Sequence, residues 1–153
     1  MKIFLIGVNH KIQWIPKPLD LGPEWHGKLE EFSEYLDHIC SKNEITLIAE
    51  EFSEEALKKS NAVDSVARQV SAKAGVQHLF CDPTTQERQT SGISTDSQRE
   101  QFWLDRLTST CHDKIIYICG EGHLKSFLGK LRMAGHDPTI LSFGWGKGWE
   151  VIS

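Results

Sequence analysis

Two histidines in this sequence follow stretches of apolar residues that are typical of buried strands. Residues 3–10 read I-F-L-I-G-x-x-H and residues 115–123 read I-I-Y-I-C-G-x-x-H, so that they end at His10 and His123. In each stretch a glycine lets the backbone turn sharply or come close to a ligand, and the histidine three residues later would project over the end of the strand. A neutral imidazole accepts a proton or binds a metal ion. His10 and His123 are therefore candidates for acid–base or metal chemistry.

Carboxylates follow two other strand-like stretches. Glu50 and Glu51 come directly after residues 45–49, and Asp82 comes shortly after residues 76–80. Ligands of parallel α/β sheets bind beyond the carboxyl ends of the strands, so these carboxylates and the two imidazoles are expected to converge there. The candidate metal ligands are His10, Glu50, Glu51, Asp82 and His123.

Two kinds of chemistry stay open for this set of residues. Imidazole and carboxylate ligands suit a divalent ion such as Mn, Co or Zn, with positions left for a water molecule that the metal activates. Without a metal, one histidine acts as a general base on water while a glutamate orients it. The sequence does not choose between these mechanisms, nor between Glu50 and Glu51 as the acting carboxylate.

Candidate substrate contacts come from two places in the sequence. The polar stretch 84–96 is predicted to be a loop, and loops commonly carry such contacts. It holds Glu87 and Arg88, and the planar fork of an arginine can clamp a carboxylate or a phosphate. Trp14, four residues after His10, forms either a wall of the pocket or an edge of the core.

Three other reactive side chains are given no role in the site. Cys81 has no basic partner signalled in the sequence and is not expected to be a nucleophile. Arg99 and Glu100, on the helix predicted to follow the loop, are interpreted as surface charges. The four cysteines include no C-x-x-C pair. This excludes zinc-finger and thioredoxin motifs and favours a reduced, cytoplasmic protein.

Two kinds of segment alternate along the chain and would position these residues. β-rich apolar runs take turns with stretches whose apolar residues are spaced by three or four. The order β-α-β-α-β-α-β-α-β predicts a single α/β domain over residues 1–153, with a mainly parallel five-stranded sheet flanked by helices. The repeated motif predicts that the first and fourth strands are neighbours. The predicted strands span residues 3–8, 45–49, 76–80, 114–119 and 139–143, and the predicted helices span residues 24–40, 53–74, 96–107 and 124–133.

Composition narrows the classes of partner. The 153 residues carry 17 Lys and Arg against 21 Asp and Glu, a formal net charge of −4, without basic clusters. This argues against nucleic acids and anionic membranes as partners, and the first apolar run is too short for a signal peptide or a membrane span. We expect a small-molecule or peptide substrate, and the oligomeric state, a homo-oligomer included, stays open. The Gly- and Trp-rich residues 144–153 predict a tail that covers the domain or a partner.

The order of these motifs resembles that of the TraB/Tiki/erythromycin-esterase-like superfamily. The resemblance rests on G-V-N-H at 7–10, the glutamates of L-I-A-E-E-F at 47–52, and C-G-E-G-H at 119–123. It implies a hydrolase that is metal-dependent, as in the Tiki proteases, or histidine-based, as in the esterases. The functional residues that it implies are His10, Glu51 (or Glu50) and His123. The chain departs from the pattern in lacking the glycine that commonly follows the late G-H motif, and it is shorter than most members.

These observations favour a small hydrolase-like protein that activates water at His10, Glu51 and His123. One alternative is a non-catalytic module that binds a nucleotide or another small ligand in the same place. In that case Arg88 and backbone amides would face the ligand while the histidines pack inside. Another alternative is an accessory or inhibitory protein that acts through the Trp-rich tail.

Overall fold

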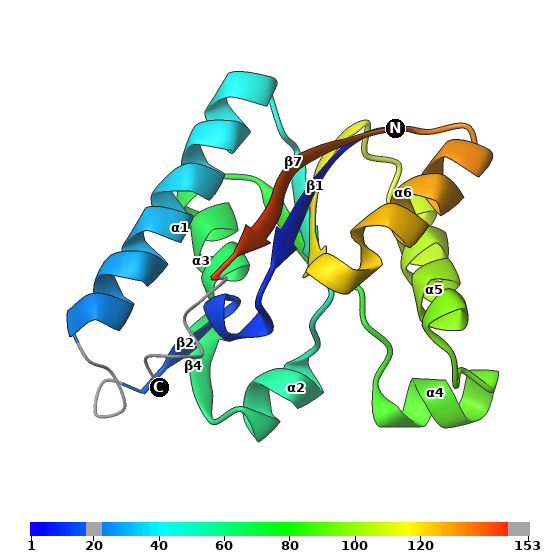
Figure 1. The fold of residues 1–153 in the computed structure, drawn as a ribbon, viewed down its shortest axis with the longest axis horizontal. Coiled ribbons are helices and arrows are strands. Elements are labelled where there is room, and N and C mark those ends of the chain that lie inside the picture. Colours follow the sequence, from blue (N-terminus) through cyan, green and yellow to red (C-terminus); the bar gives the residue numbers. More distant parts are fainter. Residues whose placement is uncertain (18–22, 147–153) are drawn as a thin grey trace.

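A five-stranded sheet forms the centre of the molecule (Figure 1). Its strands are β1 (Lys2–Val8), β3 (Leu47–Glu50), β5 (Gln77–Phe80), β6 (Lys114–Gly120) and β7 (Asp137–Trp145). This computed structural model describes residues 1–17 and 23–146 of the chain. The strands lie in the order β5-β3-β6-β1-β7, and every neighbouring pair is parallel. The predicted α/β fold and the adjacency of the first and fourth predicted strands, β1 and β6, are therefore confirmed.

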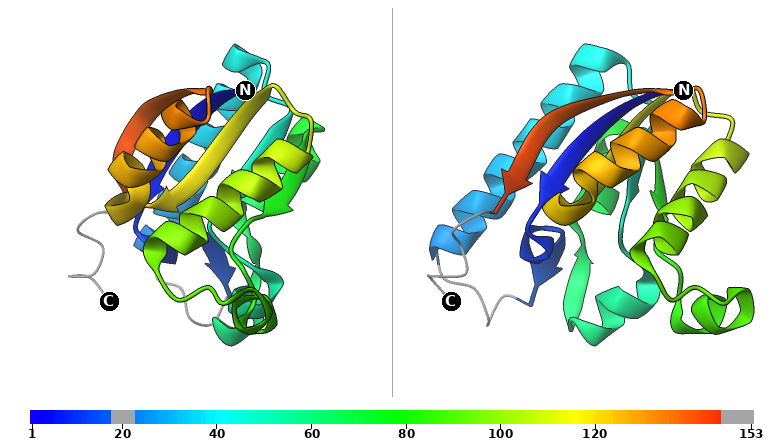
Figure 2. Two further views of the ribbon diagram at one scale, coloured as in Figure 1. Left: turned by 90° about the vertical axis from the view of Figure 1, so that its right-hand side faces the viewer. Right: turned by 45° about the vertical axis from the view of Figure 1, so that its right-hand side comes forward.

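Helices cover both faces of the sheet (Figure 2). On one face lie α1 (Pro23–Asn43) and α3 (Val66–Ala74), and on the other lie α5 (Asp96–Ser109) and α6 (Leu124–Met133). Successive residues of a strand point to opposite faces, so neighbours in β1 enter different cores. Leu5 belongs to the core beneath α5 and α6, whereas Ile6 belongs to the core beneath α1 and α3. Because both faces are buried, the strands read as continuous apolar runs.

The chain leaves β1 and β6 toward opposite faces of the sheet. After β1 it runs to α1 on one face, whereas after β6 it runs to α6 on the other. Right-handed crossovers place the helices in this way when the strand order reverses. The carboxyl ends of β1 and β6 therefore form a switch point of the kind at which α/β sheets bind ligands.

Short elements lie beyond the carboxyl ends of the strands (Figure 1). Among them, β2 (Trp14–Pro16) and β4 (Ala62–Ser65) form a separate antiparallel pair. The others are η1 (His10–Ile12), α2 (Glu54–Lys59), α4 (Thr85–Ser91) and η3 (Glu121–His123). They surround the edge of the sheet at which the candidate residues were predicted to meet.

The stretch 53–74, predicted to be helical with a break, is divided by a strand. It consists of α2, β4 and α3. Asn61 has a left-handed φ of 52° just after α2, a conformation that does not continue a right-handed helix. Ser65 then ends β4 and caps α3, because its side chain accepts a hydrogen bond from the backbone N–H of Arg68.

The predicted loop 84–96 contains the helix α4, so that part of the prediction is wrong. Thr84 and Glu87 form a capping box at its start, and Gly92 adopts a left-handed φ of 65° at its end. Threonine followed three residues later by glutamate is a sequence signal for a helix start. The polarity of the stretch concealed it, because α4 buries no residue.

The last strand is longer than predicted. β7 takes in Gly144 and Trp145, the first two residues of the predicted tail. The Trp145 ring packs on α1, with its centroid 5.5 Å from that of Phe32 and 5.0 Å from that of Tyr35. Residues 147–153 of the predicted tail lie outside the described residues. Within the described ranges, no helix has an apolar stretch long enough to cross a membrane.

The glycine that opens the first G-x-x-H motif is required by packing. A Cβ atom at Gly7 would lie 2.5 Å from Leu124 Cδ1 and 2.6 Å from the backbone oxygen of Phe143. We expect Gly7→Ala to lower the free energy of unfolding by about 1–3 kcal/mol, the usual cost of overpacking a core, measured by urea denaturation. Gly129→Ala is the control, since a Cβ there meets no atom within 4 Å and alanine is favoured inside a helix. Equal stability of the two variants would contradict the packing argument.

Candidate active site

Glu51 lies between the two histidines that were singled out by their motifs. Its Oε1 atom is 3.6 Å from His10 Nε2, and its Oε2 atom is 3.5 Å from His123 Nε2. The three side chains come from the carboxyl ends of β1, β3 and β6, which are neighbours in the sheet. The structure thus brings His10, Glu51 and His123 together. The Glu51 side chain is only 3% exposed, whereas that of His10 is 48% exposed, so His10 is the member open to solvent.

Two donors hold the Glu51 carboxylate in place. The backbone N–H of Gly120 donates to Oε1 at 2.8 Å, and Arg99 Nη2 donates to Oε2 at 2.5 Å. A Cβ atom at Gly120 would lie 2.8 Å from His10 Nε2, so the glycine makes room for the imidazole. Gly120, the glycine of the second G-x-x-H motif, therefore allows His10 to come close, and its backbone N–H donates a hydrogen bond to the Glu51 carboxylate.

Arg99 joins the site to Asp82. Its guanidinium donates to Asp82 Oδ1 at 3.0 Å, and Trp103 Nε1 donates to the same oxygen at 3.1 Å. Burial lowers the pKa of Arg99, but the charges of Asp82 and Glu51 outweigh that effect and raise it on balance. Arg99 is thus a charged member of the site whose side chain is only 19% exposed, and its interpretation as a surface charge is wrong.

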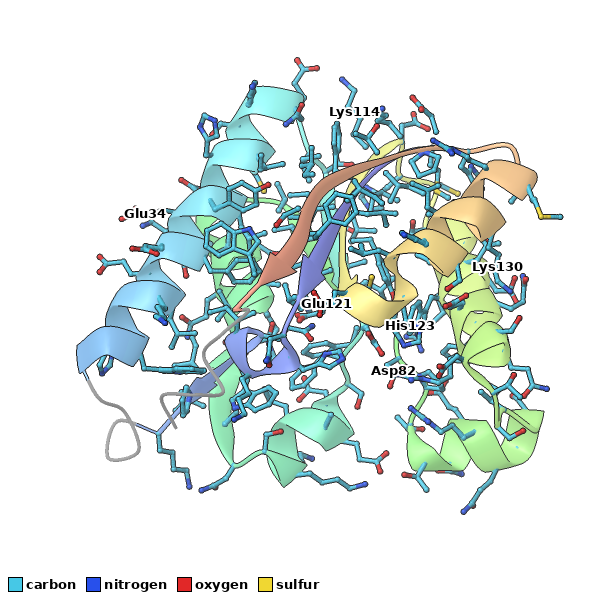
Figure 3. The ribbon with its side chains drawn as sticks, viewed as in Figure 1. Glu34, Asp82, Lys114, Glu121, His123 and Lys130 are labelled. Carbon is cyan, nitrogen blue, oxygen red and sulfur yellow. The ribbon has the colours of Figure 1, made fainter. Side chains whose placement is uncertain are left out.

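Glu100 is also buried, and it holds His123. Its Oε1 atom lies 2.9 Å from His123 Nδ1 and accepts a hydrogen bond from Ser126 Oγ at 2.6 Å. His123 therefore lies between the carboxylates of Glu100 and Glu51, with its ring edge-on to Trp103 at 5.0 Å between centroids. Figure 3 shows Asp82 and His123 in the region between the sheet and α5.

A sequence signal for these two residues existed and was missed. Arg99 and Glu100 lie four residues before Trp103 and Leu104, which are buried. Residues four apart share a face of a helix, so the apolar stripe of α5 extends through the charged pair. Charged residues in line with a buried stripe indicate a polar site rather than a solvated surface.

Glu50 faces a different set of partners from Glu51. It is fully buried and accepts hydrogen bonds from Gln13 Nε2 at 3.0 Å and from Ser65 Oγ. His78 Nε2 lies 2.6 Å from its Oε2 atom. Of the two candidate glutamates, Glu51 is thus the one in contact with the two motif histidines. Glu50 is enclosed by Gln13, Ser65 and His78, and none of these three residues was predicted to belong to the site.

The predicted divalent metal stays a prediction, and an arginine lies among its predicted ligands. Arg99 lies between the carboxylates of Glu51 and Asp82, where it already supplies a positive charge. Within residues 1–17 and 23–146, no three His, Cys, Asp or Glu side chains are grouped so that they could hold a metal ion. We therefore derive the chemistry of the site from its own side chains.

The three candidate substrate contacts have structural partners. Arg88 donates to Asp82 Oδ2 at 2.9 Å, and Glu87 closes the capping box of α4. Trp14 stacks on Phe52, with ring centroids 5.9 Å apart and planes inclined by 9°. A pocket of about 460 Å³ is lined in part by Asp82. Its lining includes Ser53, Arg68, Phe80, Asp82, Glu87 and Arg106.

The cysteines differ sharply in exposure, so we expect them to react with a thiol reagent at different rates. Cys40, Cys81 and Cys119 are buried and Cys111 is exposed. Burial, with a smaller contribution from Asp37, raises the pKa of Cys40 to about 11, and burial raises that of Cys81 further. A thiol reagent at neutral pH should therefore modify Cys111 rapidly and the other three only after denaturation. Rapid modification in a Cys111→Ser variant would contradict this burial.

The chain matches no protein-family model, no curated protein and no solved structure. The resemblance to the TraB/Tiki/erythromycin-esterase-like superfamily therefore stays a hypothesis carried by its motif residues. We infer function from the geometry of the site.

Proposed function

We propose that the protein is a hydrolase in which His10 and Glu51 activate a water molecule without a metal ion. The observation that carries this proposal is the position of the Glu51 carboxylate. It is held by Gly120 and Arg99 and faces the Nε2 atoms of both His10 and His123. A fixed carboxylate beside an accessible imidazole is a common arrangement for general-base catalysis.

The residues divide the work as follows. His10 Nε2 and Glu51 Oε1, 3.6 Å apart, are two acceptors that can share one water molecule. His10 removes a proton from this water as its oxygen attacks the substrate, and Glu51 orients the water by accepting its other hydrogen. His123 donates its Nδ1 hydrogen to Glu100. As the general acid it also carries a hydrogen on Nε2, and it gives this hydrogen to the leaving group. Proton transfer by a positioned side chain accelerates such reactions by about 10²–10⁴-fold.

We propose a small-molecule or peptide substrate and a cytoplasmic location. A substrate reaches the site from the side of His10, which has the most exposed side chain among His10, Glu51 and His123. The four cysteines are free thiols, in keeping with a reducing compartment.

A binding module in the same place would require a different arrangement of Arg88 and the two histidines. It requires Arg88 to face the ligand and the histidines to be packed inside. Arg88 instead pairs with Asp82, and half of the His10 side chain is open to solvent. These two observations favour the hydrolase.

A substrate screen tests the proposal. Esters, amides and phosphoesters are offered to the purified protein in chelator, and then with Mn²⁺, Co²⁺ or Zn²⁺. We expect turnover in chelator that falls by orders of magnitude in His10→Ala and in His123→Ala, and is unchanged in His26→Ala, whose histidine is exposed on α1. Turnover that requires a metal would support the metal-dependent mechanism instead. Turnover that survives both site substitutions would show that the site is elsewhere.

A further inference from the structure

A buried glutamine contacts the Nδ1 atom of His10, on the opposite side of the ring from the Nε2 atom that faces Glu51. This Nδ1 atom lies 2.6 Å from Gln13 Oε1, three residues further along the chain. Gln13 is 1% exposed although it is polar. It belongs to none of the sequence motifs. A polar side chain is buried without cost only when its hydrogen bonds are satisfied.

The orientation of the Gln13 amide follows from its other partners. Its Nε2 atom donates to Glu50 Oε1 at 3.0 Å and to the backbone oxygen of Glu51 at 3.4 Å. A carbonyl oxygen has no hydrogen to offer, and a flipped amide would turn its own oxygen toward the glutamate. Oε1 must therefore face His10, and an amide oxygen only accepts. The hydrogen in the short contact with His10 belongs to Nδ1.

Glu50 is in turn held so that it can fix the amide. Ser65 Oγ donates to its Oε2 atom, and His78 Nε2 lies 2.6 Å from the same oxygen. Oε1 is thereby left for Gln13. Since Glu50 is fully buried, water does not compete for these positions.

We propose that Gln13, oriented by Glu50, is a positioning residue that keeps His10 in the tautomer with hydrogen on Nδ1. This inference rests on the proposed function, because it explains which nitrogen takes the proton from water. With Nδ1 protonated, the lone pair of the neutral ring is on Nε2, beside Glu51 and on the exposed side. The 3.6 Å separation of His10 Nε2 and Glu51 Oε1 agrees with this, since it is too long for a direct hydrogen bond.

The hydrogen bond to Gln13 is needed because Glu51 favours the opposite tautomer of His10. A hydrogen on Nε2 could be donated to the Glu51 carboxylate, and neutral histidine in water already prefers that form. Without Gln13, the ring would turn its hydrogen to Glu51 and leave its lone pair on Nδ1, away from the water. The base would then be present but unable to act.

Long-range proton–nitrogen NMR correlation of the histidine rings reads the tautomer directly. The spectrum is recorded on the full chain with labelled histidine, at a pH of about 8.5, which is well above the ordinary pKa of free histidine. The His10 signals are identified as those missing in His10→Gln. We expect the pattern of hydrogen on Nδ1 in the unchanged protein. The pattern of hydrogen on Nε2 there would overturn the inference, and this measurement depends on no variant of Gln13.

Gln13→Leu should convert His10 to the tautomer with hydrogen on Nε2. The matched control is Gln77→Leu, because Gln77 Oε1 lies 3.0 Å from Nε2 of another histidine, His112, on the surface. The control should leave the His10 pattern unchanged. A Gln13→Leu variant that folds, as judged by its melting temperature, and keeps hydrogen on Nδ1 would overturn the inference.

Turnover provides the second readout. Gln13→Leu should lower kcat by about 10–100-fold, the cost that is known for losing a partner that orients a metal-bound histidine. KM should change little, because Gln13 does not touch the substrate. If no substrate turns over, the proposed function fails and the tautomer is still decided by NMR. If turnover depends on His10 but its hydrogen is on Nε2, the inference fails and the proposed function stands.

Discussion

Replacing Glu51 by glutamine should lower kcat/KM by about two to four orders of magnitude, the range that general-base catalysis contributes, because His10 can act only on a water molecule that Glu51 holds in place. The amide of glutamine fills the same space but carries no charge, and one of its two acceptor oxygens is replaced by a donor. It can therefore no longer accept from both Gly120 and Arg99, which hold the carboxylate, and still orient a water molecule. The measurement is steady-state kinetics on a substrate found in the screen, in chelator.

Glu121→Gln is the matched control for this prediction. Glu121 lies near the site, in η3 between Gly120 and His123, but it is exposed, so the same change of charge should leave turnover unaltered. Combining Glu51→Gln with His10→Ala should cost little more than either change alone, because groups that act as a unit lose activity non-additively. Equal activity of the Glu51→Gln and Glu121→Gln variants would exclude Glu51 from the mechanism.

Replacing Arg99 by alanine should lower the free energy of unfolding by about 3–5 kcal/mol, the usual cost of removing one partner from a buried ion pair. Arg99 contacts both Glu51 and Asp82, whose side chains are 3% and 15% exposed. Without the guanidinium, the buried Glu51 carboxylate and the partly buried Asp82 carboxylate would lose their shared counter-charge. Urea denaturation, followed by circular dichroism, measures the loss.

Arg88→Ala separates this effect from the general loss of an arginine. Arg88 contacts the other oxygen of Asp82, but its side chain is 39% exposed, and exposed ion pairs contribute about 0–1 kcal/mol. We expect the Arg88 variant to unfold at nearly the same urea concentration as the unchanged protein. Similar losses in the two variants would mean that burial of the Arg99 network contributes little to stability.

The sequence by itself determined the class of fold and the three residues at the centre of the candidate site. Apolar runs such as that of β1 are continuous because the sheet is covered on both faces, so their strand character can be read locally. The repeated G-x-x-H motif predicted that β1 and β6 are neighbours. It also brought His10 and His123 to one edge of the sheet, with a glutamate from β3 between them.

Only the tertiary structure decided which neighbouring side chains complete the site. Glu50 and Glu51 are adjacent in sequence, but successive residues at a strand end point to opposite faces, and the faces differ in which helices cover them. Glu50 meets Gln13 from the segment after β1, whereas Glu51 meets Arg99 from α5. The side of the sheet on which α5 packs is set by the crossovers of the whole chain. No local pattern around residue 50 contains that information, so the partners of each glutamate could be assigned only from the assembled fold.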